Sequence, residues 1–157
     1  MARRWRLWPE SNRPPCQNET SRDSRYLPEA LLRPVAGVDL IEIARIAAVL
    51  KRHPQRFLDK VFTPAEVGYC RGRVPELAVR FAAKEAISKA LGTGLKGIYF
   101  REMEIYNDRR GKPLVRLHGA AARRAGELGI ATLEVSLSHT DELAIAQVVG
   151  LATGEGS

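Results

Sequence analysis

The sequence predicts an α+β protein, in which helices of the first half pack on an antiparallel sheet as one domain of residues 34–150. Two observations carry this prediction. Between residues 42 and 91, apolar side chains recur at the three-to-four-residue spacing of amphipathic helices. Between residues 102 and 149, apolar and polar side chains alternate as in half-buried strands, with turn residues between the stretches. A chain of 157 residues is long enough to bury one core.

The two ends of the chain fall outside this domain. Residues 1–33 contain seven arginines, no lysine and no sustained apolar period, which predicts a disordered extension. This extension lacks the apolar core of a secretory signal, and we interpret it as a candidate start-site artefact. Residues 151–157 are expected to form a flexible tail.

The first element of the domain is a predicted buried strand at 35–41, which is short, apolar and rich in β-branched side chains. Strand alternation places Val35, Gly37 and Asp39 on one face. A carboxylate at the end of an apolar strand is costly unless a cation, a metal ion or backbone donors compensate it. Asp39 is therefore a candidate metal ligand, and the alternative is that it caps the next helix.

Three helices are expected next. Residues 42–53 carry an apolar stripe. Thr63 begins a second helix, because proline follows it at the first helical position and glutamate stands three residues after it. The third helix begins at Pro75 and ends near residue 91, where glycines follow.

The third helix carries the residues around which a site is expected. Ala83, Ala86 and Ala90 share one face, which is thin enough for another element to approach closely. Another face presents Glu85 and, one turn later, Lys89. Spacing alone favours an ordinary ion pair on an exposed helix, worth about 0.2–0.5 kcal/mol.

The second half is predicted to contain two hairpins and one helix. Strands are expected at 102–106 and 113–117 across one turn, and at 132–139 and 143–149 across another. Residues 119–128 are rich in alanine and predict a helix that ends at a glycine.

Charge and cysteine content limit the class of protein. The formal net charge of +7 favours an anionic partner, which could be a nucleic acid, a membrane, a phosphorylated small molecule or an acidic protein. Cys16 and Cys70 form no metal or disulfide pattern, so a reducing, cytoplasmic location is expected. No stretch approaches the roughly 18 apolar residues that a membrane span needs.

The candidate site consists of Asp39 and Glu85, with Lys89 beside the second carboxylate and His139 at a strand end. This set suits Mg²⁺ and a phosphate, because the ion takes few protein carboxylates and keeps waters or substrate oxygens. The lysine would neutralise phosphate charge in the transition state. A nuclease, a phosphatase or a phosphoryl-type transferase could use such a site. His139 has an alternative interpretation, as a histidine at a sheet edge with its hydrogen bonds satisfied.

Four motifs occur together in the chain. They are Gly37-Val38-Asp39, the helical stretch Arg80-Phe81-Ala82-Ala83-Lys84-Glu85-Ala86-Ile87-Ser88-Lys89-Ala90 with Leu91-Gly92-Thr93-Gly94, the turn Gly111-Lys112-Pro113, and the strand end Ser136-Leu137-Ser138-His139-Thr140. In this order and spacing they resemble the holo-[acyl-carrier-protein] synthases, the small AcpS-type branch of the 4′-phosphopantetheinyl transferases. The resemblance covers about residues 35–150.

The resemblance implies that phosphopantetheine is transferred from coenzyme A to a serine of apo acyl carrier protein in fatty acid biosynthesis, with release of adenosine 3′,5′-bisphosphate. It implies that Asp39 and Glu85 hold Mg²⁺ and that Lys89 meets the phosphates. The positions that match the coenzyme A site are Arg80, Lys89, Gly111, Lys112, Pro113 and His139. Glu85 is the first choice for activating the serine, and Asp39 or a metal-ordered water is the alternative. Lys84 points about 100° away from Glu85 around the helix and is assigned no role.

The resemblance also implies protein partners. Arg45 and Arg52 lie on the predicted first helix, where the family presents basic side chains to the acidic carrier protein. On spacing alone, such a row is usually solvated surface. Members of this branch are homotrimers, with the coenzyme site in the cleft between neighbouring subunits.

Two other functions compete with this one. The basic balance would suit a nucleic-acid-binding module, but no binding motif is present and the two carboxylates would be unexplained. A Mg²⁺-dependent hydrolase of pyrophosphates would share the site and need no carrier protein. Neither a nucleic acid nor a membrane is expected as a partner.

Overall fold

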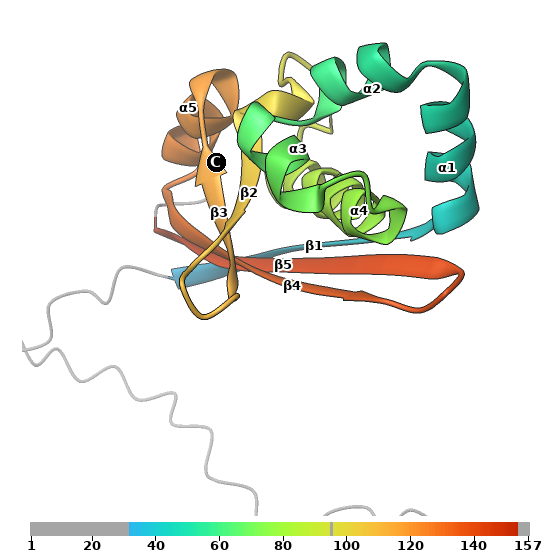
Figure 1. The fold of residues 1–157 in the computed structure, drawn as a ribbon. Helices are drawn as coiled ribbons and strands as arrows, with labels where there is room; N and C mark the ends of the chain where they lie inside the picture. Colours follow the sequence, from blue (N-terminus) through green and yellow to red (C-terminus); the bar gives the residue numbers. More distant parts are fainter. Residues whose placement is uncertain (1–31, 95, 154–157) are drawn as a thin grey trace, which may run out of the picture.

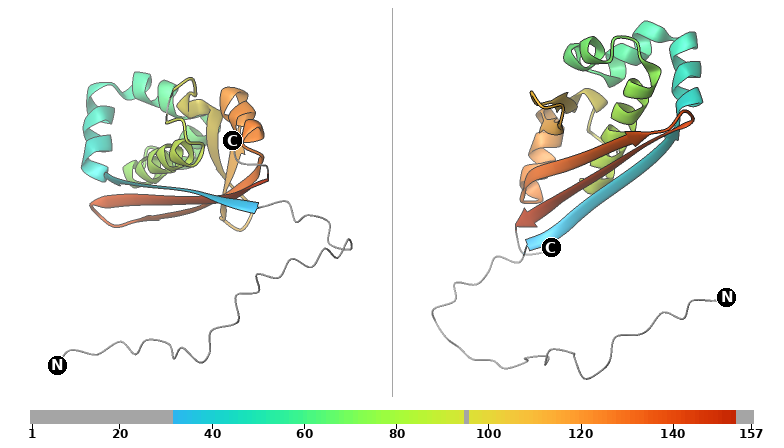
Figure 2. Two further views of the ribbon diagram at one scale, coloured as in Figure 1. Left: turned by 180° about the vertical axis from the view of Figure 1, so that it is seen from behind. Right: turned by 60° about the horizontal axis from the view of Figure 1, so that its bottom comes forward.

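A computed structural model describes residues 32–94 and 96–153. Within them, the helices lie on one side of a three-stranded antiparallel sheet, and a two-stranded sheet stands beside it (Figure 1; Figure 2). In chain order the elements are β1 (Leu32–Glu42), α1 (Ile43–Arg52), α2 (Pro54–Val61), α3 (Pro64–Cys70), α4 (Val74–Ala90), the 3₁₀ helix η2 (Phe100–Glu102), β2 (Met103–Asn107), β3 (Pro113–Leu117), α5 (Gly119–Glu127), β4 (Ile130–His139) and β5 (Leu143–Thr153). The predicted α+β fold is confirmed.

The larger sheet has the strand order β1-β5-β4, so β1 and β4 are its two edges. One row of the sheet crosses from Asp39 on β1 through Ala146 to Leu137 on β4. Alternation along β1 buries Gly37 and half-buries Val35 and Asp39, as predicted for one strand face. The strands β2 and β3 form a hairpin in the separate sheet.

Helix α4 packs against β1 and β5 and carries the centre of the core. Its alanine face is buried, and it meets β1 backbone to backbone. A Cβ atom added to Gly37 would lie 1.9 Å from the carbonyl oxygen of Ala86 and 3.0 Å from the backbone nitrogen of Ala90. The close approach expected from the alanine face is therefore confirmed, and glycine at position 37 permits it.

Helix α3 begins with the predicted capping box. The Thr63 hydroxyl accepts a hydrogen bond from the backbone nitrogen of Glu66 at 3.3 Å, and the Glu66 carboxylate accepts one from the backbone nitrogen of Thr63 at 2.8 Å. Proline at the first helical position completes the pattern.

Two strands extend beyond the sequence-based expectations. Strand β1 begins at Leu32, and β5 continues to Thr153, because residues 32–34 pair with 151–153. The predicted flexible tail is thus wrong for 151–153, and the predicted extension is wrong for residues 32–33. Residues 1–31 and 154–157, the rest of those two predictions, lie outside the described residues.

A further helix, α2, follows α1 immediately and was not predicted as a separate element. Pro54 is its first residue, which suits a helix start because proline needs no intrahelical donor there. Within residues 32–94 and 96–153, no helix is both long and apolar enough to cross a bilayer.

Candidate active site

A first cluster joins β1 to α4. The Lys89 ammonium lies 2.9 Å from a carboxylate oxygen of Asp39 and 2.8 Å from the carbonyl oxygen of Val38. Glu85 lies one turn before Lys89 on the same helix, near enough for its ionisation to respond to both charges. The structure therefore brings together the three residues predicted to form the centre of the site.

Neither structural alternative for these residues occurs in the described part of the chain. Asp39 lies within β1, and α1 begins only at Ile43, so Asp39 does not cap that helix. Lys89 pairs with Asp39 across two elements, whereas spacing alone favoured a pair with Glu85; no such pair occurs among the described residues.

The negative charges of the Asp39 and Glu85 carboxylates repel each other. Partial burial raises the pKa of Glu85, the negative charge of Asp39 raises it further, and the positive charge of Lys89 lowers it. A cation placed between the carboxylates would relieve this repulsion. Within the described part of the chain, no group of three or more histidine, cysteine, aspartate or glutamate side chains is placed to hold a metal ion. Two carboxylates suit Mg²⁺, which completes its shell with waters and substrate oxygens.

A second cluster surrounds a cavity of about 200 Å³ on the other side of α4. It is lined by Tyr69, Glu76, Val79, Arg80, Asn107, Gly111, Pro113, Leu137, Ser138 and His139. Four of the predicted coenzyme-binding residues are thus brought together here. The cavity is smaller than the roughly 300–1,000 Å³ that is typical of ligand sites.

Arg80 is almost fully buried in this second cluster. Its guanidinium donates hydrogen bonds to the Glu76 carboxylate at 2.9 Å and to the Asn107 side-chain oxygen at 2.7 Å. It also lies over the Tyr69 ring, 4.3 Å from the centroid. The Nε atom has no hydrogen-bond partner among the described residues. Arg80 therefore shapes the cavity wall and keeps one unpaired donor.

The turn between β2 and β3 holds the glycine and proline of the predicted motif. The Asn107 amide donates to the carbonyl oxygen of Gly111 at 2.9 Å and so closes the turn. Lys112 does not line the cavity, because its ammonium pairs with Glu134 at 2.7 Å on the surface. His139 lines the cavity at the exposed end of β4, and its Nδ1 lies 3.2 Å from the Thr140 carbonyl oxygen.

The two clusters lie at opposite edges of the sheet. Asp39 belongs to edge strand β1, whereas the second cavity includes the end of edge strand β4, with β5 between them. Among the described residues, the lining of this cavity includes none of Asp39, Glu85 and Lys89. Within one chain, the two clusters are therefore separate.

Sequence reasoning missed several residues that shape this region. Tyr69, Glu76 and Asn107 surround Arg80, and no local pattern marks them. Lys84, to which no role was assigned, has a fully buried side chain that pairs with buried Glu66. A lysine with no exposed surface must be paired, but its partner stands 18 residues away, beyond the reach of helix periodicity.

Comparisons with known proteins agree with this architecture. The model of the 4′-phosphopantetheinyl transferase superfamily (ACPS) matches residues 36–148. The holo-[acyl-carrier-protein] synthase of Herpetosiphon aurantiacus is 56% identical over 124 residues, covering 74% of this chain and 98% of that protein. The synthase of Halothermothrix orenii is 47% identical over 117 residues, with 73% and 94% coverage. The crystal structure of Helicobacter pylori holo-[acyl-carrier-protein] synthase in complex with coenzyme A superposes with a TM-score of 0.68 at 34% identity, covering 73% of this chain and 98% of that one.

Proposed function

This chain belongs to the holo-[acyl-carrier-protein] synthases of the 4′-phosphopantetheinyl transferase superfamily, and from that premise we propose how its residues carry out the transfer. A serine oxygen of apo acyl carrier protein attacks the phosphorus that bears the pantetheine of coenzyme A. The bond from that phosphorus to the bridging oxygen breaks, and adenosine 3′,5′-bisphosphate leaves. The observation that carries the proposal is the meeting of Asp39, Glu85 and Lys89 at one edge of the sheet.

Asp39 and Glu85 are the proposed Mg²⁺ ligands. Their mutual repulsion and their number fit an ion that takes few protein carboxylates. When bound, Mg²⁺ supplies positive charge to the pyrophosphate oxygens. Lys89 uses two of its three N–H donors on Asp39 and Val38, which leaves one for a phosphate oxygen of the leaving group.

Glu85 is the proposed acceptor of the serine proton. Partial burial raises the pKa of Glu85, and a higher pKa means a stronger affinity for a proton. Asp39 is less suited, since one of its oxygens is held by the Lys89 ammonium at 2.9 Å. The proton passes to Glu85 directly or through one water.

The second cluster is the proposed site for the adenosine bisphosphate end of coenzyme A. Tyr69 and Arg80 form one wall, and the turn with Gly111 and Pro113 forms another. Arg80 also brings a positive charge to this wall, which would favour an anionic ligand in the cavity. Lys112 can reach a phosphate only if it exchanges its exposed pairing with Glu134, which costs little at the surface.

A homotrimer is proposed, with each complete site built from two subunits. The half-sites of one chain are separated by α4, so a neighbouring chain has to supply the missing half. The sheet face opposite the helices is also apolar. Its exposed side chains on β1 and β5 include Leu32, Val38, Leu40, Ile145, Val149 and Leu151. An apolar face of this extent marks a protein interface, and closed symmetry explains how a second and a third copy cover it.

Replacing Leu40 by arginine is expected to dissociate the trimer. Leu40 is 58% exposed on the apolar sheet face, and a charge there would be buried without a partner in the assembly. Light scattering coupled to gel filtration should give about three times 17.4 kDa for the natural protein and the mass of one chain for Leu40→Arg. Val49→Arg on α1, also at an exposed apolar residue, is the matched control and should keep the larger mass. A natural protein that runs as one chain would contradict the trimer.

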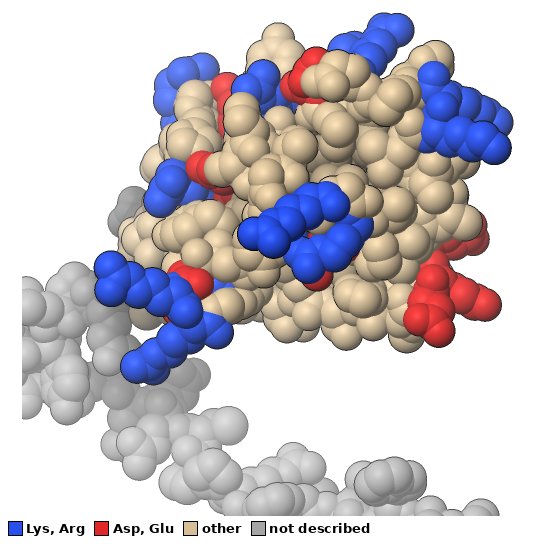
Figure 3. Space-filling view, viewed as in Figure 1, with Lys and Arg blue, Asp and Glu red and all other residues tan. Residues whose placement is uncertain are grey.

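The carrier protein is proposed to dock on α1. Arg45 and Arg52 are both exposed on this helix, and basic side chains gather where α1 passes into α2 (Figure 3). Such a surface is complementary to an acidic partner and speeds its association. Arg45 lies in the first turn of α1, so a carrier protein that contacts it would lie near the end of the strand that holds Asp39.

Charge reversal at Arg45 is expected to weaken the binding of the carrier protein and to leave the binding of coenzyme A unchanged. Arg45→Glu replaces attraction by repulsion, so the KM for acyl carrier protein should rise about 10-fold in steady-state assays. Arg123→Glu on α5 changes the net charge equally and should leave both KM values near those of the natural protein. Equal increases in the two KM values for Arg45→Glu would exclude docking on this helix.

The proposal places the product in fatty acid biosynthesis and the protein in the cytoplasm. An acyl carrier protein becomes able to bind acyl groups only after it receives the phosphopantetheine thiol. The absence of a metal or disulfide pattern at the cysteines supports a reducing compartment.

Intact-mass measurement of a carrier protein tests the function directly. Apo acyl carrier protein incubated with this protein, coenzyme A and Mg²⁺ is expected to gain one phosphopantetheine group. EDTA should stop the gain and excess Mg²⁺ should restore it. Without the ion, the two carboxylates and the pyrophosphate are all negatively charged and repel one another. No gain with several carrier proteins, from a folded protein, would overturn the proposal and favour a pyrophosphate hydrolase.

A further inference from the structure

A buried polar junction lies inside the helical layer, and the mechanism described so far does not use it. The Lys84 ammonium donates to the Glu66 carboxylate at 2.9 Å, to the carbonyl oxygen of Phe100 at 3.0 Å and to that of Met103 at 2.8 Å. All three donors of the ammonium are therefore used. The side chains of Lys84 and Glu66 are 0% and 1% exposed.

Glu66 extends the junction to two more backbone groups. Its carboxylate accepts from the backbone nitrogen of Ile105 at 3.1 Å and from that of Thr63 at 2.8 Å. The pair thus ties α4 to the start of α3, to η2 and to β2. Each of these backbone groups would lose its partner if the pair were removed.

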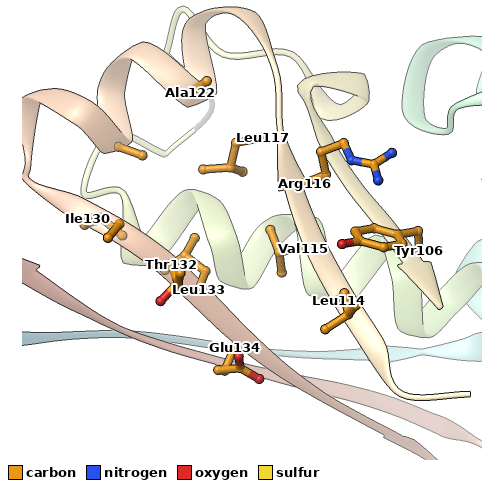
Figure 4. A pocket seen from close by; sticks show the side chains of 12 residues that line it. Tyr106, Leu114, Val115, Arg116, Leu117, Ala122, Ile130, Thr132, Leu133 and Glu134 are labelled. Atoms are coloured by element: carbon orange, nitrogen blue, oxygen red, sulfur yellow. The ribbon is translucent and has the colours of Figure 1, made fainter. Parts of the chain in front are cut away.

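The hairpin of β2 and β3 is a separate sheet from β1, β5 and β4. Strand β3 forms no ladder with β4, because the two strands belong to different sheets. An open cavity of about 450 Å³ lies between them, bounded by β3, β4 and α5 (Figure 4). At its rim, the exposed pair of Lys112 and Glu134 bridges the gap, and such surface pairs hold position weakly. The junction is thus a polar attachment between the hairpin and α4, in addition to the hydrogen bond from Arg80 to Asn107.

We infer that Lys84 and Glu66 are positioning residues, which fix the β2–β3 hairpin relative to α4 and thereby set the geometry of the coenzyme half-site. The inference rests on the proposed function. The hairpin supplies Asn107, Gly111 and Pro113 to the second cavity, and α4 supplies Arg80. Lys84 also directly precedes Glu85, so the junction fixes the rotation of the helix that carries the carboxylate. One interaction therefore orients residues of both half-sites.

A double variant separates positioning from stability. Lys84→Met or Glu66→Gln alone leaves a polar partner buried and mismatched, whereas the two together remove both charges and keep an amide oxygen for the Ile105 donor. The folded double variant is expected to bind adenosine 3′,5′-bisphosphate about 10-fold more weakly and to show a kcat about 10–100-fold lower, because small misplacements of a site are costly. The KM for carrier protein should not change, since α1 is not part of the junction. Glu127→Gln, which removes an exposed ion pair on α5, is the control.

Hydrogen exchange gives a readout that does not depend on activity. The amides of β2 and β3 should exchange faster in the double variant, while those of β5 keep the rate of the natural protein. Should the double variant not fold, Glu66→Gln alone leaves Lys84 on two carbonyl oxygens and is expected to show the same changes in smaller measure. Natural exchange rates in the hairpin, with unchanged nucleotide affinity in a folded variant, would overturn the inference. Failure of the natural protein to modify a carrier protein would instead overturn the proposed function, and hydrogen exchange would still decide on the junction.

Discussion

Glu85→Gln is expected to lower the rate of phosphopantetheine transfer by about 10²–10⁴-fold, which is the usual loss when a general base is removed. Glutamine cannot accept the serine proton and carries no charge for Mg²⁺. The measurement is the initial rate of holo-protein formation at saturating coenzyme A and carrier protein. Glu127→Gln, at an exposed carboxylate on α5, is the matched control and should retain the natural rate.

The same substitution is expected to leave the fold intact and slightly more stable in EDTA at neutral pH. The raised pKa of Glu85 means that its ionised form is less favourable in the folded than in the unfolded chain. This cost is absent below the pKa of unfolded glutamate and fully present above the raised folded value. Thermal unfolding of Glu85→Gln should therefore occur at or above the temperature of the natural protein. Near-natural activity in a folded Glu85→Gln would remove this residue from the mechanism.

Gly37→Ala is expected to lower the free energy of unfolding by about 3 kcal/mol, at the upper end of the usual cost of overpacking. The added Cβ atom would meet the Ala86 carbonyl oxygen at 1.9 Å, and backbone atoms cannot turn aside as a flexible side chain can. β1 and α4 must then move apart, which also separates Asp39 from Lys89. Denaturant unfolding measures the loss of stability, and the transfer assay measures the loss of activity.

Gly68→Ala is the matched control, and its expected effect on the free energy of unfolding has the opposite sign. Gly68 lies within α3, and a Cβ atom there would have no neighbour within 4 Å. Alanine is the better helix former, so the free energy of unfolding should rise by about 0.5–1 kcal/mol. Equal effects of the two substitutions would show that the contact between β1 and α4 is not tight.

Local patterns predicted the elements well because each signal lies within a few residues. The capping box at Thr63 and Glu66, the alanine face of α4 and the alternation along β4 each depend on neighbours in sequence. The separate helix α2 was missed because the predicted first helix stopped at residue 53, before Pro54, and no further helix was expected until Thr63, although proline also suits the first turn of a helix.

The arrangement of the site depended on contacts that are distant in sequence. Asp39 and Lys89 stand 50 residues apart, and spacing alone favoured a partner for Lys89 on its own helix. The motifs named the three residues that meet in the first cluster. They did not reveal that strand order places the second cluster at the other edge of the sheet, since antiparallel pairing of β1 with β5 has no local signal.

The burial of Lys84 was equally hidden. Helix geometry correctly placed Lys84 on a different face from Glu85. Because this face does not belong to the expected site, Lys84 was assigned no role. Only the fold shows that this side of α4 faces α3 and β2, where an ammonium group finds three acceptors.

The separation of the half-sites on one chain has a genetic consequence under the proposed assembly. A subunit that lacks Glu85 still carries an intact second cavity, and a subunit with a damaged cavity still carries Asp39, Glu85 and Lys89. Two alleles, each inactive alone, could therefore restore working sites when their products assemble together. A defective subunit would likewise inactivate only those sites to which it contributes its damaged half. Such alleles would therefore be partly and not fully dominant.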